Sequence, residues 1–127
     1  MKQTLATGLL IVVGLINGIP VIGIWSASVL ESLYAVGRLD GDLLILMRHR
    51  ALLFGILGAW IVTAAFRPTL RPAAMLAAAV SMAGFVVLAL MQGSFGEKIQ
   101  GVVWADLVGL ALLVFAFFLG RDSVSRP

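Results

Sequence analysis

The chain has 127 residues, of which 61% are hydrophobic and only 12% are charged. Soluble domains carry roughly 25% charged residues, so this composition excludes an ordinary soluble domain and predicts a membrane protein. The net charge of +3 comes from Lys and Arg residues that are scattered along apolar segments and form no basic face. We therefore expect these residues to flank apolar segments that span the lipid bilayer, and we exclude nucleic acid as a partner.

The cysteine and histidine contents limit the chemistry further. The sequence has no cysteine, which excludes disulfides, thiol chemistry and Cys-ligated metals. Its one histidine, His49, does not supply enough ligands for a zinc or haem site within a single chain. We expect neither a metal nor a cofactor.

The first predicted transmembrane helix covers about residues 5–24, a length of roughly 30 Å that matches the hydrocarbon core of a bilayer. A charged N-terminus before an apolar run also resembles a signal peptide, but no small-residue cleavage site stands out before Trp25. We interpret the segment as a retained helix, and we expect Pro20 to kink it near its end.

Three small or polar residues in this span predict helix contacts. Gly14 and Gly18 are four residues apart, a spacing that lets another helix approach closely. Asn17 lies between them in the sequence. Two interpretations stay open for Asn17: an interhelical hydrogen bond that holds the bundle together, or a polar ligand in a cavity.

The sequence does not predict a membrane-spanning helix in residues 25–42. Ser28 followed by Glu31 fits a capping box, and Gly37 is suited to end the short helix that follows. We expect this helix to lie at the membrane interface. Asp42 is the predicted N-cap of the next span.

The second predicted span covers about residues 43–66 and includes the basic turn Arg48, His49 and Arg50. The apolar run after this turn is roughly 24 Å long, which is short for a crossing, so the helix must include the turn. The three basic residues therefore lie near one boundary of the hydrocarbon layer.

Two further spans are predicted at about residues 73–91 and 102–119. The third span carries a face of small residues suited to close packing, namely Ala74, Ala77, Ala78, Ser81 and Gly84. Together the spans predict an all-α fold class: a four-helix transmembrane bundle with a short interfacial helix after the first span. We expect residues 1–127 to form a single integral membrane domain, with both termini on the side that has a slight excess of Lys and Arg, the cytoplasmic side.

Asp106 is the polar residue inside a span that most needs a partner, because an unpaired carboxylate in the apolar layer is costly. The chain topology places Arg48, His49, Arg50 and Asn17 in the same leaflet as Asp106. We expect these residues to form a polar cluster at one end of the bundle.

Within this cluster we prefer Arg48 over Arg50 as the partner of Asp106. Arg48 shares a helix face with Leu52, Gly55, Ala59 and Thr63, a stripe of mostly small residues that we expect to face the bundle. Arg50 is closer to Asp106 in depth, but its face looks lipid-facing, so we expect it to extend toward the headgroups.

Five segments of the chain carry a resemblance: Asn17-Gly18-Ile19-Pro20, Leu46 to Gly55 with the basic turn, Ala65-Phe66-Arg67-Pro68, Val80-Ser81-Met82 and Ala105-Asp106-Leu107. They resemble recurring segments of a family of short four-span inner-membrane proteins of proteobacteria. The broader architecture is similar to the small DoxX-like four-helix proteins. The resemblance implies a bacterial inner membrane location but no settled biochemical role.

Members of that family are sometimes labelled phosphopantetheine adenylyltransferase. The sequence argues against this label, because such enzymes resemble soluble α/β nucleotidyltransferases with a His-x-Gly-His phosphate site. Here there is one histidine and no Gly-rich turn between a strand and a helix.

The function we expect is a non-enzymatic structural or accessory membrane protein, which could associate with a membrane-protein partner or with its own copies. The alternative is a small proton- or cation-linked transporter, or a membrane protein that binds a lipid or another small molecule, with Asp106 in its site. An enzyme that acts on a lipid or isoprenoid substrate with His49 and Asp106 as acid and base is a third hypothesis. The cluster has no nucleophile–base pair, so we assign no catalytic residue.

Overall fold

Helices make up all the regular secondary structure that the computed structural model describes, which is the backbone of residues 1–124 and the side chains of residues 1–121. In chain order the elements are α1 (Lys2–Gly18), the 3-10 helix η1 (Ile19–Ile24), α2 (Ala27–Tyr34), α3 (Gly41–Phe66), the 3-10 helix η2 (Pro68–Leu70), α4 (Arg71–Gln92) and α5 (Glu97–Val124). The predicted all-α fold class is confirmed.

Four segments of the described chain are long and apolar enough to cross a membrane. They are Lys2–Ile24, Gly41–Phe66, Pro68–Gln92 and Glu97–Arg121. Each contains one of the spans predicted from the sequence, and the short helix predicted after the first span is α2. The chain is therefore built as a small multi-pass membrane protein.

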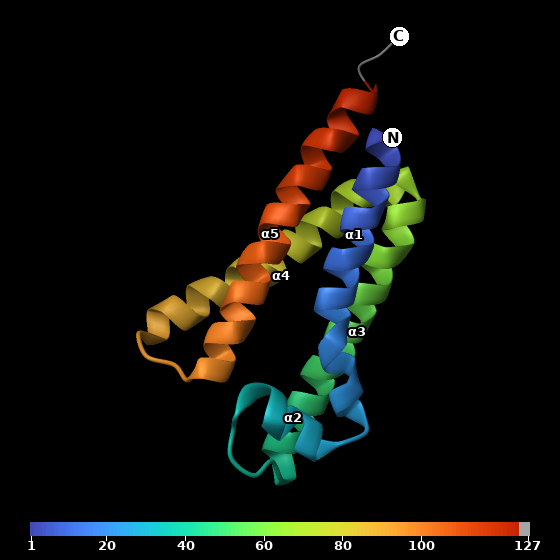
Figure 1. Ribbon diagram of the computed structural model, residues 1–127. Helices are drawn as coiled ribbons and strands as arrows, with labels where there is room; N and C mark the ends of the chain where they lie inside the picture. The colour runs from blue at the N-terminus through green and yellow to red at the C-terminus, as the bar shows by residue number, and fades with distance from the viewer. Residues whose placement is uncertain (125–127) are drawn as a thin grey trace.

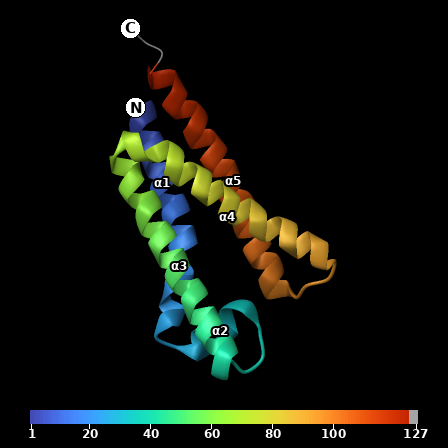
Figure 2. The same cartoon turned by 180° about the vertical axis from the view of Figure 1, so that it is seen from behind.

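The helices form two pairs that meet at one end and separate at the other. Helices α1 and α3 lie side by side, and α4 and α5 form a hairpin (Figure 1). The view from behind shows the same arrangement, with the turn of the α4–α5 hairpin leaning away from α1 and α3 (Figure 2). The short helix α2 lies at the open end, whereas α1 begins and α5 ends at the closed end (Figure 1).

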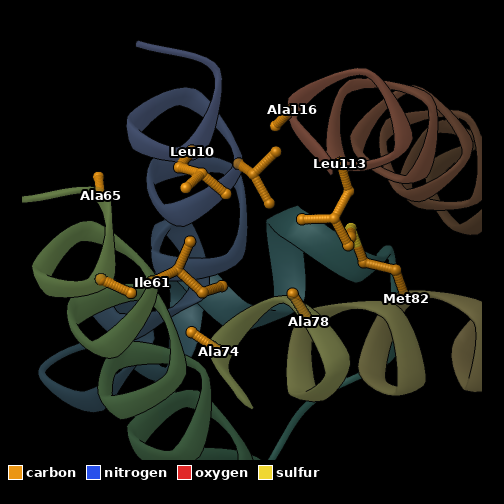
Figure 3. Close-up of a cluster of buried hydrophobic side chains, with 10 residues drawn as sticks. Leu10, Ile61, Ala65, Ala74, Ala78, Met82, Leu113 and Ala116 are labelled. Atoms are coloured by element: carbon orange, nitrogen blue, oxygen red, sulfur yellow. The ribbon is translucent and has the colours of Figure 1, made fainter. Parts of the chain in front are cut away.

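The closed end is held by a cluster of buried side chains from all four long helices. Figure 3 shows side chains of α1, α3, α4 and α5 converging on one another. The fully buried members include Leu10, Val13, Ile61 and Met82, and alanines fill the narrow space between them. The predicted small-residue face of α4 is confirmed in part, because Ala74 and Ala78 are buried in this cluster.

The contact between α1 and α3 depends on three glycines. A Cβ atom built on Gly58 of α3 would lie 2.6 Å from the carbonyl oxygen of Gly14 and 2.8 Å from the Cα of Gly18. Both obstructing groups are backbone atoms, which cannot move aside as a flexible side chain would. The predicted close approach at Gly14 and Gly18 is therefore confirmed, and Gly58 is the opposing residue.

Arg71, at the start of α4, joins three helix ends at the closed end of the bundle. Its guanidinium donates hydrogen bonds to the carbonyl oxygens of Ala64 (3.3 Å) and Ala65 (2.7 Å), in the last turn of α3. It also donates to Gln3 Oε1 (2.8 Å) and Thr7 Oγ1 (3.0 Å) of α1. Carbonyl groups at a helix C-terminus lack the usual partner within the helix. Arg71 adds a charged donor to the two that Ala64 and Ala65 already have, the N–H of Arg67 (3.2 Å) and the hydroxyl of Thr7 (3.3 Å).

Two helix boundaries differ from the sequence prediction. The α-helix of the first span ends at Gly18, and a 3-10 helix follows, where we expected a kink at Pro20 within one helix. Proline has no N–H to continue the α-helical bonds and fits the first turn of a new helix. Asp40, with extended backbone angles, is the N-cap of α3, so the prediction that Asp42 caps this helix is wrong; Asp42 lies in its first turn.

The predicted capping box of α2 is also wrong. The N-cap is Ser26, and the Ser28 hydroxyl pairs with the Ser26 hydroxyl at 2.8 Å. The carboxylate of Glu31 instead accepts a hydrogen bond of 2.7 Å from the backbone N–H of Leu39. Glu31 thus stabilises the loop after α2, and the helix ends before the predicted Gly37.

We predict that Gly58→Ala destabilises the protein, because the new methyl group would push α1 away from α3. Overpacking of this kind costs roughly 1–3 kcal/mol. The matched control is Gly84→Ala on α4, where an added Cβ meets nothing within 4 Å. Thermal unfolding in a mild detergent should show a lower midpoint for Gly58→Ala alone; equal midpoints would contradict the glycine contact.

We also predict that Arg71→Met destabilises the closed end, because two carbonyl groups of α3 lose a charged donor. Hydrogen bonds to charged groups contribute roughly 1.5–3 kcal/mol each, so we expect a loss of at least about 2 kcal/mol. Arg67 is exposed and directly follows the last residue of α3. Arg67→Met removes the same charge and serves as the control. Chemical unfolding of both variants in detergent tests this, and equal losses would show that charge alone is responsible.

Candidate functional site

A pocket of about 750 Å³ lies where the two helix pairs separate. Its walls come from α1, η1, α2, α3, α4 and α5, so every helical element except η2 contributes to it. The lining is mostly apolar, and the polar or charged members are Asn17, Ser28, Ser32, Tyr34, Arg50, Lys98 and Asp106. Pockets for small molecules typically measure 300–1,000 Å³ and combine apolar walls with a few polar groups.

Arg50 of α3 is surrounded by aromatic rings on one side of this pocket. Its guanidinium carbon lies 4.9 Å from the ring centre of Tyr34, 5.1 Å from that of Phe54 and 5.5 Å from that of Phe85. These distances are within the range of cation–π attraction, which strengthens when the groups are removed from water. Side chains of α2, α3 and α4 therefore hold the guanidinium in place.

Asp106 of α5 lines the same pocket, at a similar distance from the start of its own helix. Arg50 is nine residues after the start of α3 at Gly41, and Asp106 is nine residues after the start of α5 at Glu97. Both helices begin at the open end, so each residue lies about 13–14 Å along its helix. The charge of Arg50 acts on the Asp106 carboxyl group, but the two form no ion pair in the described part of the chain.

The preference for Arg48 as the residue beside Asp106 is wrong. Arg48 is exposed, and neither it nor the exposed His49 lines the pocket. The buried stripe of α3 runs through Ala51, Gly58, Ile61, Ala64 and Ala65. This stripe is displaced around the helix from the face of Leu52, Ala59 and Thr63, which are exposed. Arg50 borders the buried stripe, whereas Arg48 points elsewhere because successive residues are about 100° apart.

Asn17 forms a hydrogen bond between helices, which was the first of its two interpretations, and it also lines the pocket. Its side chain is 4% exposed, and its amide nitrogen donates to the carbonyl oxygen of Val13 at 2.9 Å and to the sulfur of Met82 at 3.7 Å. The second bond joins α1 to α4, as expected for a residue that holds the bundle together. Of the predicted cluster, Asn17, Arg50 and Asp106 share one pocket.

Sequence reasoning missed the aromatic residues and Lys98. Phe54 stands four residues after Arg50, so the two were predictable neighbours on one helix face. Tyr34 and Phe85 belong to other helices, and their approach to Arg50 depends on packing that no local pattern reveals. Tyr34 is held in place by a second buried cluster with Leu30, Leu39 and Ala51.

The arrangement can bind a molecule but offers few catalytic groups. Among the described residues, no group of three or more His, Asp or Glu side chains is placed to hold a metal ion. The pocket combines cationic groups, hydroxyl groups and apolar walls. Such a lining suits a molecule with one polar end and one apolar end.

A second pocket of about 860 Å³ lies toward the closed end, between α1, α4 and α5. Its lining is mainly apolar, and the polar or charged members are Gln3, Arg71 and Arg121. Arg71 is already engaged by α1 and α3. This pocket contains no carboxylate, hydroxyl group or aromatic cage around a cation among its described lining residues, in contrast to the pocket beside Arg50.

Comparison with family models, with curated protein sequences and with solved structures found no match for this chain. The resemblance to short four-span inner-membrane proteins therefore stays a prediction from the sequence.

The titration of Tyr34 should measure the burial and the charges at this site, because Tyr34 is the only tyrosine of the chain. Burial raises the pKa of its hydroxyl above the ordinary value of 10.0; the positive charge of Arg50 lowers it in part, and the negative charge of Asp106 adds to the rise. We expect the tyrosinate absorbance to appear above that value. Arg50→Gln should move the midpoint higher still, because the charge that favours tyrosinate is gone.

The raised pKa of Tyr34 also sets the sign of the pH dependence of stability. A group whose folded pKa exceeds its unfolded value stabilises the fold fully below the unfolded pKa, and this stabilisation is lost as the pH rises toward the folded pKa. Stability should therefore fall from about pH 10 upward, and less so in Tyr34→Phe. A tyrosinate midpoint at or below the ordinary value would contradict the burial of Tyr34 beside Arg50.

Proposed function

We propose that this chain is a non-enzymatic multi-pass membrane protein that holds an amphipathic molecule from the bilayer in the pocket beside Arg50. The observation that carries this proposal is the pocket of about 750 Å³ that opens where the α4–α5 hairpin separates from α1 and α3. Its size and its few polar groups fit one lipid-like molecule or part of one.

The distribution of polarity supports an amphipathic ligand. Apolar residues such as Ile16, Leu33, Val102 and Ala105 form most of the lining. The polar groups could contact a headgroup, while the apolar walls would cover a tail. A fully polar molecule would leave these walls exposed to water, and a fully apolar one would leave Arg50 without a polar partner.

The outer faces of the helices support residence in the bilayer and an accessory role. Large apolar side chains such as Ile45, Leu76 and Phe115 are exposed on α3, α4 and α5. Such surfaces suit lipid tails or the helices of a membrane-protein partner. In this proposal the protein resides in a bacterial inner membrane with both termini in the cytoplasm, as the sequence predicts.

A cation-linked transporter receives less support than a binding protein. Aromatic rings that would attract a cationic cargo already surround Arg50 of the chain itself. A cationic ligand would also meet Lys98 in the same pocket. Asp106 is the one carboxylate among the described lining residues that would favour such a cargo.

We predict that filling the pocket abolishes binding. Ala105→Trp introduces a large ring into the lining, whereas Ala111→Trp introduces the same ring on the exposed face of the same helix. Native mass spectrometry of protein released from the membrane should show a co-purifying amphiphile with the parent protein and Ala111→Trp. Occupancy in Ala105→Trp should fall by about tenfold or more, which corresponds to 1.4 kcal/mol.

The unfolding midpoints of both variants provide the folding control for this experiment. Equal occupancy in the two folded variants would show that bound lipid lies on the outer surface and would refute the proposed function.

A further inference from the structure

We infer that the molecule held in the pocket is a membrane lipid with a single negatively charged headgroup, bound through its phosphate or carboxylate oxygens by Arg50 and Lys98. This inference rests on the proposed function, because it names the chemical class of the ligand of the same pocket. Three features carry it: the charge balance of the lining, the N–H donors of Arg50 that no described protein group accepts from, and the aromatic rings around that residue.

The charge balance favours an anion. The lining contains two cationic side chains, Arg50 and Lys98, and one carboxylate, Asp106. One negative charge on the ligand would neutralise the excess positive charge. Arg50 is partly buried beside apolar groups, where uncompensated charge is costly, so a singly charged anion removes a cost that a neutral ligand would leave. Lys98 is exposed and adds attraction for the same anion.

Arg50 has hydrogen-bonding capacity to spare. Within the part of the chain that the structure describes, its guanidinium contacts three aromatic rings but donates no hydrogen bond and forms no ion pair. A guanidinium has five N–H donors in a planar arrangement that matches a carboxylate or phosphate. Two oxygens of such a group could accept parallel hydrogen bonds from it.

The rings around Arg50 also limit what else can bind there. Tyr34, Phe54 and Phe85 present their rings to the guanidinium, so the positions that would attract a ligand cation are occupied by a cation of the protein. The same contacts fix the guanidinium before binding, which lowers the entropy lost when a ligand is bound.

Hydroxyl groups in the lining add to the polar part of the pocket. Ser28, Ser32 and Tyr34 all line the pocket and all come from α2. They can donate to the remaining oxygens of a headgroup. Lys98 is exposed in the first turn of α5, at the end where α2 lies, so the cationic and hydroxyl groups belong to the open end of the bundle.

The surroundings favour a lipid over a free anion. Arg50 lies about 13–14 Å from the start of a helix that is apolar enough to cross a membrane. A free phosphate would have to lose its water in this apolar pocket without gaining contacts from a tail. A lipid gains the burial of its tail against the apolar lining, at about 0.8 kcal/mol per CH₂ group.

The test compares lipids that share tails and differ only in the headgroup. The protein is prepared in detergent with a fluorescent, tail-labelled phosphatidylglycerol, and unlabelled phosphatidylglycerol, phosphatidylcholine or inorganic phosphate is added as competitor. We expect phosphatidylglycerol to compete about tenfold or more better than phosphatidylcholine, a difference of 1.4 kcal/mol. Inorganic phosphate should not compete at millimolar concentration.

Charge-removing variants locate the interaction. Arg50→Gln should reduce the preference for the anionic lipid to about twofold or less, whereas Arg48→Gln, two residues away on an exposed face, should retain it. Lys98 is exposed, so Lys98→Gln removes the second cation without changing a buried side chain. This variant tests whether Lys98 contributes to the preference for the anionic lipid. It should lower the preference by several fold at low salt.

The outcomes separate the ligand class from the proposed function. If both lipids compete equally and Ala105→Trp blocks both, the pocket binds amphiphiles but the anionic headgroup is refuted. If neither lipid binds in an Ala105-dependent way, the proposed function fails as well. Displacement by inorganic phosphate alone would overturn the lipid source, and a preference unchanged in both Arg50→Gln and Lys98→Gln would overturn the assignment of these residues.

Discussion

The close backbone contact between α1 and α3 is the constraint on which the rest of the structure depends. Gly58 faces Gly14 and Gly18 with no room for a side chain, so the two helices form a tight pair along much of their length. Arg71 then ties the start of α4 to the ends of both helices. The α4–α5 hairpin is therefore joined firmly at the closed end, while its turn leans away at the other (Figure 1).

This geometry creates the pocket and decides which charges reach it. Because α4 and α5 separate from α1 and α3, the residues nearer the open end cannot all pack against one another. Aromatic rings from three helices close around Arg50, and Asp106 approaches the same space from α5. Charged groups so placed are costly unless they are paired, solvated or bound to a ligand. The charges of Arg50 and Asp106 therefore make this pocket the candidate binding site.

Much of the fold was predictable from the chain itself. The apolar runs marked the four spans, because a helix that crosses a membrane needs about twenty apolar residues. Gly14 and Gly18 predicted a close contact between helices, and Asp106 predicted a polar site with other polar residues beside it. Side-chain orientation was the weak point: Arg48 and Arg50 differ by about 200° around α3, and a helix apolar on nearly all sides gives little indication of its buried face.

The sequence by itself determined the membrane class, the helical architecture and the polar residues at one end, since these follow from hydropathy and from the cost of unsatisfied backbone groups in lipid. Only the tertiary structure decided that Arg50 meets Tyr34 and Phe85, that Glu31 holds the backbone of Leu39, and that a pocket remains between the helix pairs. The contacts of Arg50 and the walls of the pocket join residues that are distant in sequence. They depend on helix rotation and crossing geometry, which packing sets and local composition does not encode.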